Sequence, residues 1–175
     1  MRFIWLLAAA LLVGLDRITK NIVSANMELN ETIHIIKAGD VEVLNIYYCL
    51  NNGAAFSQLQ GRRMLLIIIT SIVILGLLYM VVFNKIKRPV YCAAAALMLG
   101  GGIGNLIDRI FNNGLVVDFI DVRLINFPIF NVADICAVCG AALLFLTYVI
   151  DEIKQKKAKK SGASENDSKT NDGKA

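Results

Sequence analysis

Aspartates are the residues of this sequence whose type and position best suit chemistry. Asp16, Asp108 and Asp134 lie within or at the end of long apolar runs, where a charge is costly and usually faces a cavity or a partner. Asp118 and Asp121 lie in the connection between the last two runs. Two carboxylates held close together share one proton, so that one can activate a water while the other acts as an acid. The candidate chemistries are therefore aspartyl hydrolysis and transport of protons or cations through paired carboxylates.

Other catalytic chemistries lack their residues here. His34 is the only histidine, and it lies in a polar connection where we expect it to be exposed. No serine or cysteine nucleophile has a histidine base at hand, and we predict neither a metal centre nor a cofactor. The Cys136-x-x-Cys139 pair lies in an apolar run, so we interpret both cysteines as packing residues rather than redox or metal groups.

The composition places the aspartates in a membrane protein. Of 175 residues, 57% are hydrophobic, and the net charge of +4 is too small to indicate a nucleic-acid partner. A spanning helix needs roughly 20 mostly apolar residues. We predict an all-α integral membrane protein with four transmembrane helices and a small extracytosolic β element. The predicted spans cover residues 3–23, 64–83, 90–108 and 129–150, in a domain of residues 1–153 followed by a basic, disordered cytoplasmic tail of residues 154–175.

The first span has an alternative interpretation as a cleaved signal peptide. We favour a retained helix, because no small-x-small cleavage site follows the apolar stretch promptly. A cleaved segment would also have no reason to carry Asp16 and Lys20 on one helical face. With four spans, the density of basic residues places both termini and the 84–89 loop in the cytoplasm. We expect the alternating stretch Val41–Tyr48, on the outer side, to form a strand.

Three of the aspartates lie at one depth. At 1.5 Å per residue, Asp16, Asp108 and Asp134 are roughly 20, 27 and 24 Å from the cytoplasmic ends of their helices. With a hydrocarbon core of about 30 Å, all three fall near the outer boundary. Gly100 and Gly104 share a face of the third helix and permit close approach of a neighbour.

These patterns leave two interpretations open. The carboxylates could form a functional polar site, or they could be structural, with Asp108 and Arg109 as a helix-end charge pair and Asp134 as a helix cap. Asn131 and Asp134 are three residues apart and share a face in either case. A transporter would need carboxylates along a path to the cytoplasm, and the inner halves of the predicted helices lack charge. A non-catalytic assembly factor would tolerate Asp118→Asn.

Five sequence blocks, in this order, resemble the bacterial lipoprotein signal peptidase family (signal peptidase II). They are Asp16-Arg17-Ile18-Thr19-Lys20, Asn52-Gly53-Ala54-Ala55-Phe56, Gly104-Asn105-Leu106-Ile107-Asp108-Arg109, Val116-Val117-Asp118-Phe119-Ile120 and Phe127-Pro128-Ile129-Phe130-Asn131-Val132-Ala133-Asp134. The resemblance covers residues 3–150. It implies an aspartic endopeptidase of the bacterial cytoplasmic membrane that removes signal peptides from diacylglyceryl-modified prolipoproteins by cleaving before the lipidated cysteine.

The resemblance also implies roles for individual residues. The catalytic pair would be Asp118 and Asp134, and Asp121 would not belong to it. Residues that bind substrate or support the site would be Asp16, Lys20, Asn52, Gly53, Gly101, Gly104, Asn105, Asp108, Arg109, Asn131 and Ala133. The site would lie near the outer face, and the expected partners are prolipoprotein substrates and membrane lipids. We expect a monomer, since one chain supplies the whole site. Leu50 and the Ile135-Cys136 pair depart from residues common in the family.

Overall fold

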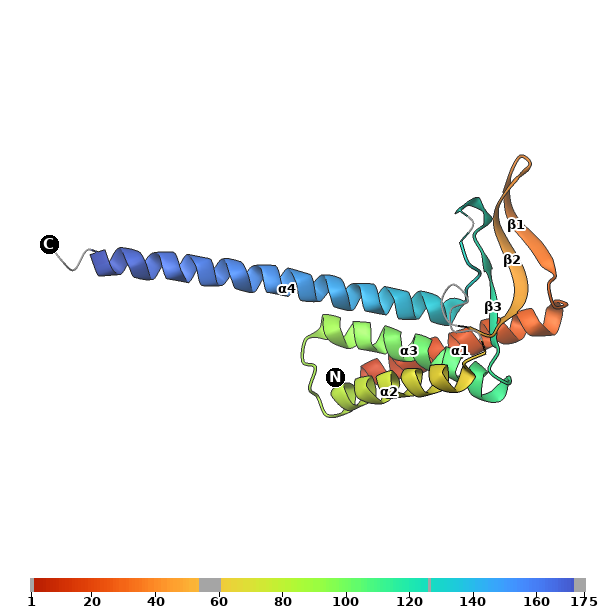
Figure 1. The fold of residues 1–175 in the computed structure, drawn as a ribbon, viewed down its shortest axis with the longest axis horizontal. Helices are drawn as coiled ribbons and strands as arrows, with labels where there is room; N and C mark the ends of the chain where they lie inside the picture. The colour runs from red at the N-terminus through yellow and green to blue at the C-terminus, as the bar shows by residue number, and fades with distance from the viewer. Residues whose placement is uncertain (1, 54–60, 126, 172–175) are drawn as a thin grey trace.

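Four long helices make up most of the molecule. The computed structural model describes residues 2–53, 61–125 and 127–171, and within these ranges it describes the side chains of residues 3–157. The helices are α1 (Arg2–Asn26), α2 (Arg63–Val82), α3 (Pro89–Phe111) and α4 (Val132–Asn171), and a short 3-10 helix η2 covers Arg123–Ile125. In Figure 1 the helices lie side by side, and α3 contacts each of the other three.

Among the described residues, three helices are long and apolar enough to cross a membrane. They are α2, α3 and the part of α4 from Val132 to Lys157. The predicted span 3–23 is present as the helix α1, but it does not belong to this group, because Asp16, Arg17 and Lys20 interrupt its apolar sequence. The molecule is thus mostly helical, with three candidate membrane spans and a small sheet.

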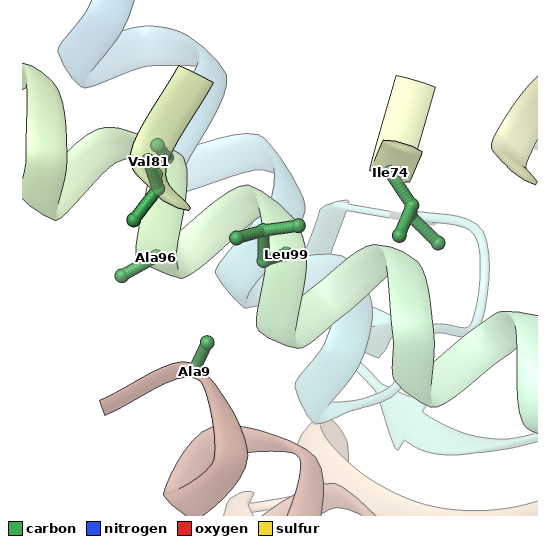
Figure 2. Packing of buried hydrophobic residues seen from close by; sticks show 6 residues of the cluster. Ala9, Ile74, Val81, Ala96 and Leu99 are labelled. Atoms are coloured by element: carbon green, nitrogen blue, oxygen red, sulfur yellow. The ribbon is translucent and has the colours of Figure 1, made fainter. Parts of the chain in front are cut away.

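One apolar core, near the α2–α3 connection, lies between α1, α2 and α3. Figure 2 shows Ala9 of α1, Ile74 and Val81 of α2, and Ala96 and Leu99 of α3 in one buried cluster. The small residues of α3 allow this close packing. A Cβ on Gly100 would lie 2.7 Å from the Cβ of Leu12, so the close approach predicted for this face of α3 is present.

A three-stranded antiparallel sheet stands at one end of the bundle, across the helix axes (Figure 1). Its strands are β1 (Thr32–Ala38), β2 (Val41–Asn51) and β3 (Val116–Asp121), with β2 in the middle. The predicted strand is confirmed by β2. The strand β3 was not predicted from the sequence, which indicated only a connection between the last two apolar runs. Its Val, Phe and Ile side chains are good strand formers, and Phe119 packs on Val23 of α1.

Both ends of α4 differ from the prediction. The helix begins at Val132 rather than at residue 129, because Asn131 caps it. It then continues to Asn171, through most of the segment that we expected to be a disordered tail. Lys, Gln and Ala at residues 154–160 favour helix, and extending an existing helix needs no new nucleus. Figure 1 shows this part of α4 projecting beyond the other helices.

Candidate functional site

The first turn of α4 positions Asp134 through a reciprocal pair of hydrogen bonds. The backbone N–H of Asp134 donates to Asn131 Oδ1 (2.9 Å), and the backbone N–H of Asn131 donates to Asp134 Oδ2 (3.2 Å). This is a capping box, in which the residue before the helix and the third helical residue satisfy each other's backbone donors. The two roles considered for Asp134, as a helix cap and as a site residue, are therefore compatible. The capping hydrogen bonds fix the position of its carboxylate.

Asp118 of β3 is connected to the same cap. Asn131 Nδ2 donates to Asp118 Oδ1 (2.6 Å), so Asn131 is hydrogen-bonded to both aspartates. Asn51 of β2 donates from Nδ2 to the other oxygen of Asp118 (2.9 Å). The orientation of the Asn51 amide is defined, because its own Oδ1 accepts the backbone N–H of Gly53 (2.8 Å). Asp118 is 2% exposed and Asn131 is fully buried.

A buried lysine lies beneath the two aspartates. Lys20 Nζ is 2.9 Å from Asp16 Oδ2, 2.9 Å from Asp108 Oδ2 and 2.8 Å from Asn105 Oδ1. Lys20, Asp16 and Asp108 are at most 1% exposed, so these charges are stabilised by one another rather than by solvent. Arg17, which is partly exposed, also pairs with Asp108.

The partners of Lys20 hold the elements that carry Asp118 and Asp134. Asp16 Oδ1 accepts the backbone N–H of Ala133, in the first turn of α4 (3.0 Å). Asp108 Oδ2 accepts the backbone N–H of Val117, next to Asp118 in β3 (3.3 Å). The two ion pairs of one lysine on α1 therefore fix the start of α4 and the strand β3 relative to each other.

Asn105 and Arg109 of α3 complete the polar surroundings. Asn105 Nδ2 donates to Asp134 Oδ1 (2.7 Å), while its Oδ1 accepts from Lys20, so this amide links the lysine to the aspartate. Arg109 Nη2 donates to the backbone carbonyl of Gly53 (3.0 Å), and its guanidinium acts electrostatically on both Asp118 and Asp134.

Two opposing effects act on the Asp118 carboxyl. Burial and the nearby charge of Asp134 raise its pKa, whereas hydrogen bonds from Asn51 and Asn131 lower it. Burial is the largest effect, and the resulting pKa of Asp118 is about 7. Near neutral pH this carboxyl can therefore hold or release a proton, as a group that acts in acid–base chemistry must.

Most of the residues predicted for the site lie together. Hydrogen bonds or ion pairs join Asp16, Lys20, Gly53, Asn105, Asp108, Arg109, Asp118, Asn131, Ala133 and Asp134. Gly104 also belongs to this region, since a Cβ there would lie 2.6 Å from Asp16 Oδ2 and 3.1 Å from the Cβ of Ala133. Gly101 faces α4, where an added Cβ would lie 2.7 Å from the backbone nitrogen of Ala137.

Some residues lie elsewhere than the sequence analysis expected. Asn52 is exposed, and its side chain makes no hydrogen bond within the described ranges, whereas its neighbour Asn51 binds Asp118. Side chains two positions apart in a strand point to the same side. Asn51 is two positions from Cys49, the cross-strand neighbour of Asp118, so alternation along β2 could have indicated Asn51. Asp121, which the family resemblance left out of the catalytic pair, is opposite Asn45 and pairs with Arg123 (3.1 Å), away from the cap of α4. Residues 54–60, part of the second block, lie outside the described residues.

The arrangement suits acid–base chemistry at two carboxylates. Asp118 and Asp134 come from different elements, share Asn131, and sit above an ion network that holds both elements. Asp134 is only partly buried, which leaves its carboxylate accessible to a reactant. Within the described ranges, no three His, Cys, Asp or Glu residues are arranged as metal ligands. Two carboxylates held in this way can take part in acid–base chemistry.

Comparison with known proteins finds a family model and relatives that match most of the chain. The family model described as signal peptidase (SPase) II matches residues 8–150. The lipoprotein signal peptidase of Halalkalibacterium halodurans is 43% identical over 158 residues, covering 89% of this chain and 98% of that protein. That of Bacillus subtilis is 38% identical over 156 residues, covering 88% and 98%. A bacterial membrane enzyme solved in meso at 2.3 Å superposes with a TM-score of 0.77 at 33% identity, covering 85% of this chain and 88% of that one.

Proposed function

The chain belongs to the signal peptidase II family, and we propose that it removes signal peptides from prolipoproteins by aspartic catalysis at Asp118 and Asp134. The family establishes a peptidase, and the aspartic chemistry rests on the geometry of the site. The observation that carries it is the bridge through Asn131, which is hydrogen-bonded to both carboxylates.

The charges of the site support a dyad that shares one proton. Four carboxylates belong to it in the described part of the chain: Asp16, Asp108, Asp118 and Asp134. Three cations face them: Arg17, Lys20 and Arg109. The cluster is electrically neutral only when one carboxylate is protonated, and a neutral state is favoured where solvent is excluded. The pKa of Asp118, raised to about 7, supports Asp118 as the carboxyl that carries this proton.

Asp134 then acts as the ionised partner. It lies in the first turn of α4, where the helix dipole favours a negative charge, and both of its oxygens accept hydrogen bonds. We assign Asp134 as the general base and Asp118 as the general acid for the first step. The pair titrates as a unit, so these assignments describe the state that the charges favour.

The reaction follows from these protonation states. Asp134 takes a proton from a water as its oxygen attacks the scissile carbonyl carbon, and Asp118 gives its proton to the carbonyl oxygen. The tetrahedral intermediate then returns a hydroxyl proton to Asp118. Asp134 gives the proton it took to the leaving nitrogen, and the C–N bond breaks. Both aspartates regain their starting protonation states.

The proposed substrates are prolipoproteins that carry a diacylglyceryl group on a cysteine, cleaved just before that cysteine. This substrate class comes from the family, whose members bear the name lipoprotein signal peptidase. We propose that Arg109 and Gly53 bind the substrate backbone, because Arg109 interacts electrostatically with both aspartates and donates a hydrogen bond to Gly53. All of the interacting groups come from one chain, which supports action as a monomer.

We further propose that α1 is a fourth membrane span. The charges of Asp16, Arg17 and Lys20 are compensated by ion pairs, so they do not oppose insertion of the helix into lipid. Its opposite face is a continuous stripe of exposed large apolar side chains: Phe3, Leu7, Leu11, Leu15, Ile18 and Ile22. Both termini then share one side. The basic α2–α3 connection indicates that this side is the cytoplasm of a bacterial cell, which puts the dyad near the outer face of its membrane.

The proposal is tested by cleavage of a diacylglyceryl-modified prolipoprotein peptide by the purified protein in detergent. Wild type should cleave immediately before the lipidated cysteine. Asp118→Asn and Asp134→Asn should each reduce the rate by about 10²–10⁴-fold, the usual contribution of a general acid or base.

A matched control lies three residues away from Asp118. Asp121→Asn also removes a buried carboxylate from β3, but one that pairs with Arg123 rather than with the cap of α4, and it should leave cleavage near the wild-type rate. Full activity in either dyad variant would exclude the proposed mechanism. Correctly folded wild type that binds the peptide without cleaving it would exclude the proposed activity.

A further inference from the structure

At the end of the bundle opposite the dyad, exposed cations gather from two segments. The connection between α2 and α3 carries Lys85, Lys87 and Arg88, all exposed. On α4, Lys154, Lys156 and Lys157 are exposed as well. The two segments are far apart in the sequence, and Figure 1 shows the α2–α3 connection beside the middle of α4.

Asp151 holds these two segments together. Its carboxylate pairs with Arg88, and its Oδ2 accepts a hydrogen bond from the Tyr91 hydroxyl (2.8 Å). The Arg88 guanidinium also lies 5.4 Å from the centre of the Tyr91 ring. Three contacts among three side chains thus fix the loop against α4, so that the cations of both segments form one surface.

The carboxylates at this end are already engaged. Asp151 is bound by Arg88 and Tyr91, and Glu152 is paired with Lys156 (3.4 Å). Lys85, Lys87, Lys154 and Lys157 have no carboxylate within salt-bridge distance in the described part of the chain. Lys154 acts electrostatically on the nearby Asp151, but none of the four lysines forms a salt bridge in the described part of the chain. We call these four lysines the cytoplasmic basic surface.

The side chains near this surface change along the helices as the layers of a bilayer do. Tyr79, Phe83 and Tyr148 are exposed at this end of α2 and α4, as expected of aromatic side chains at a membrane interface. Lys154 follows Tyr148 by six residues, which is about 9 Å along the helix. Apolar helix, aromatic side chains and lysines thus follow one another in the order of hydrocarbon core, interface and headgroups.

We propose that the cytoplasmic basic surface binds the headgroups of anionic phospholipids, such as phosphatidylglycerol, in preference to zwitterionic ones. Unpaired lysines supply the charge, and the Arg88–Asp151–Tyr91 contacts hold the lysines of both segments at one level. A basic side chain near an anionic membrane contributes about 1 kcal/mol, which corresponds to roughly a fivefold preference for each lysine engaged. This binding does not depend on the proposed peptidase activity.

The single tryptophan of the chain provides the measurement. Trp5 is partly buried and packs against the cluster that contains Val81 and Ile86, next to the basic surface. Full-length protein is reconstituted in phosphatidylcholine bilayers that contain brominated phosphatidylglycerol or, in parallel, brominated phosphatidylcholine. The quenching of Trp5 reports the relative affinity of the two lipids at this end of the molecule. Wild type should favour phosphatidylglycerol by at least about fivefold.

Two double variants remove two lysines each from the surface. Lys85→Gln/Lys87→Gln and Lys154→Gln/Lys157→Gln should each lower the preference by at least about fivefold. The matched control is Lys37→Gln/Arg62→Gln, which removes two exposed cations at the other end and should leave the preference unchanged.

Equal quenching of wild type by the two brominated lipids would overturn the proposal and leave the lysines as solvated charges. An equal loss in the control variant would also overturn it, since only the total charge would then matter. All three variants should cleave the prolipoprotein peptide at the wild-type rate in zwitterionic detergent. If wild type lacks cleavage but retains the lipid preference, the proposed function fails while this inference stands.

Discussion

Asn51 and Asn52 are adjacent in the sequence and occupy different environments. The Asn51 amide is held by Gly53 and donates to Asp118, whereas Asn52 is exposed. Successive residues at the end of a strand point to opposite sides, so a shift of one residue decides which side chain reaches the dyad. Which of two adjacent residues in a motif reaches the site therefore depends on the direction in which its side chain points.

Replacing these two asparagines separates their roles. Asn51→Ala removes a hydrogen bond to a buried carboxyl, and we expect kcat/KM for the prolipoprotein peptide to fall about tenfold or more. Asn52→Ala is the matched control and should remain within about twofold of wild type, as expected for an exposed side chain. Equal losses of kcat/KM in both variants would mean that cleavage depends on the backbone at the end of β2 rather than on the Asn51 amide.

The pH dependence of cleavage follows from the proton on Asp118. As pH rises through about 7, Asp118 loses its proton, both carboxylates become ionised, and the general acid is lost. The value of kcat/KM should therefore fall about tenfold per pH unit above this point. Because the Asn51 hydrogen bond lowers the pKa of Asp118, Asn51→Ala should move the alkaline limb to higher pH. A profile flat to pH 9 would contradict the assignment.

At the scale of elements, one lysine connects α1 to the start of α4 and to β3. Lys20 and Asp16 form an i,i+4 pair in the buried network, and Lys156 and Glu152 form a pair of the same spacing on the exposed surface. The two pairs differ in burial, which determines how much their loss costs. Breaking a buried pair leaves an uncompensated charge, whereas exposed pairs contribute little.

Substituting each lysine by methionine tests this difference. We expect Lys20→Met to lower the free energy of unfolding by about 3–5 kcal/mol, because Asp16 and Asp108 lose a shared partner. Lys156→Met should leave the unfolding temperature in detergent close to that of wild type. Comparable shifts in the two variants would mean that solvent or lipid headgroups reach Lys20 and replace its role.

The position of Asp16 at the start of α4 also requires close helix packing at Gly104. A Cβ at Gly104 would meet Asp16 and Ala133, whereas one at Gly76 would meet nothing within 4 Å. Gly104→Ala should therefore destabilise the protein by about 1–3 kcal/mol and reduce cleavage, because it displaces Asp16 from the start of α4. Gly76→Ala should be neutral or slightly stabilising. Thermal unfolding in detergent measures both, and an unaffected Gly104→Ala variant would contradict the close approach.

At the scale of the molecule, the arrangement in the membrane depends on α1. In a cysteine-free background, Asp40→Cys lies in the β1–β2 connection and Asn84→Cys in the α2–α3 connection. We expect an impermeant maleimide to label Asp40→Cys in intact cells and Asn84→Cys only after permeabilisation. The intact mass of the purified protein should include α1. The reverse labelling pattern would mean that the chain has the opposite orientation in the membrane. A mass that lacks α1 would exclude this helix as a fourth span.

Apolar runs and alternation in the sequence predicted the four helices and the strand β2, although not the ends of α4. Most of the polar residues that cluster were also among the predicted site residues. Long apolar runs and alternation are local patterns, and a helix or a strand expresses them directly. Burial of Asp16 and Lys20 was also indicated, since charges on one face of an apolar helix require partners. The family blocks then narrowed five candidate aspartates to two.

Which side chains contact one another became known from the folded structure. It joined Asn131 to both Asp118 and Asp134, placed Asn51 rather than Asn52 at the dyad, and separated Asp121 from it. It also showed that residues 116–121 form a strand, because pairing with β2 is a non-local interaction that no sequence window contains. Hydrogen bonds between distant segments depend on register and helix packing, and these are properties of the assembled chain.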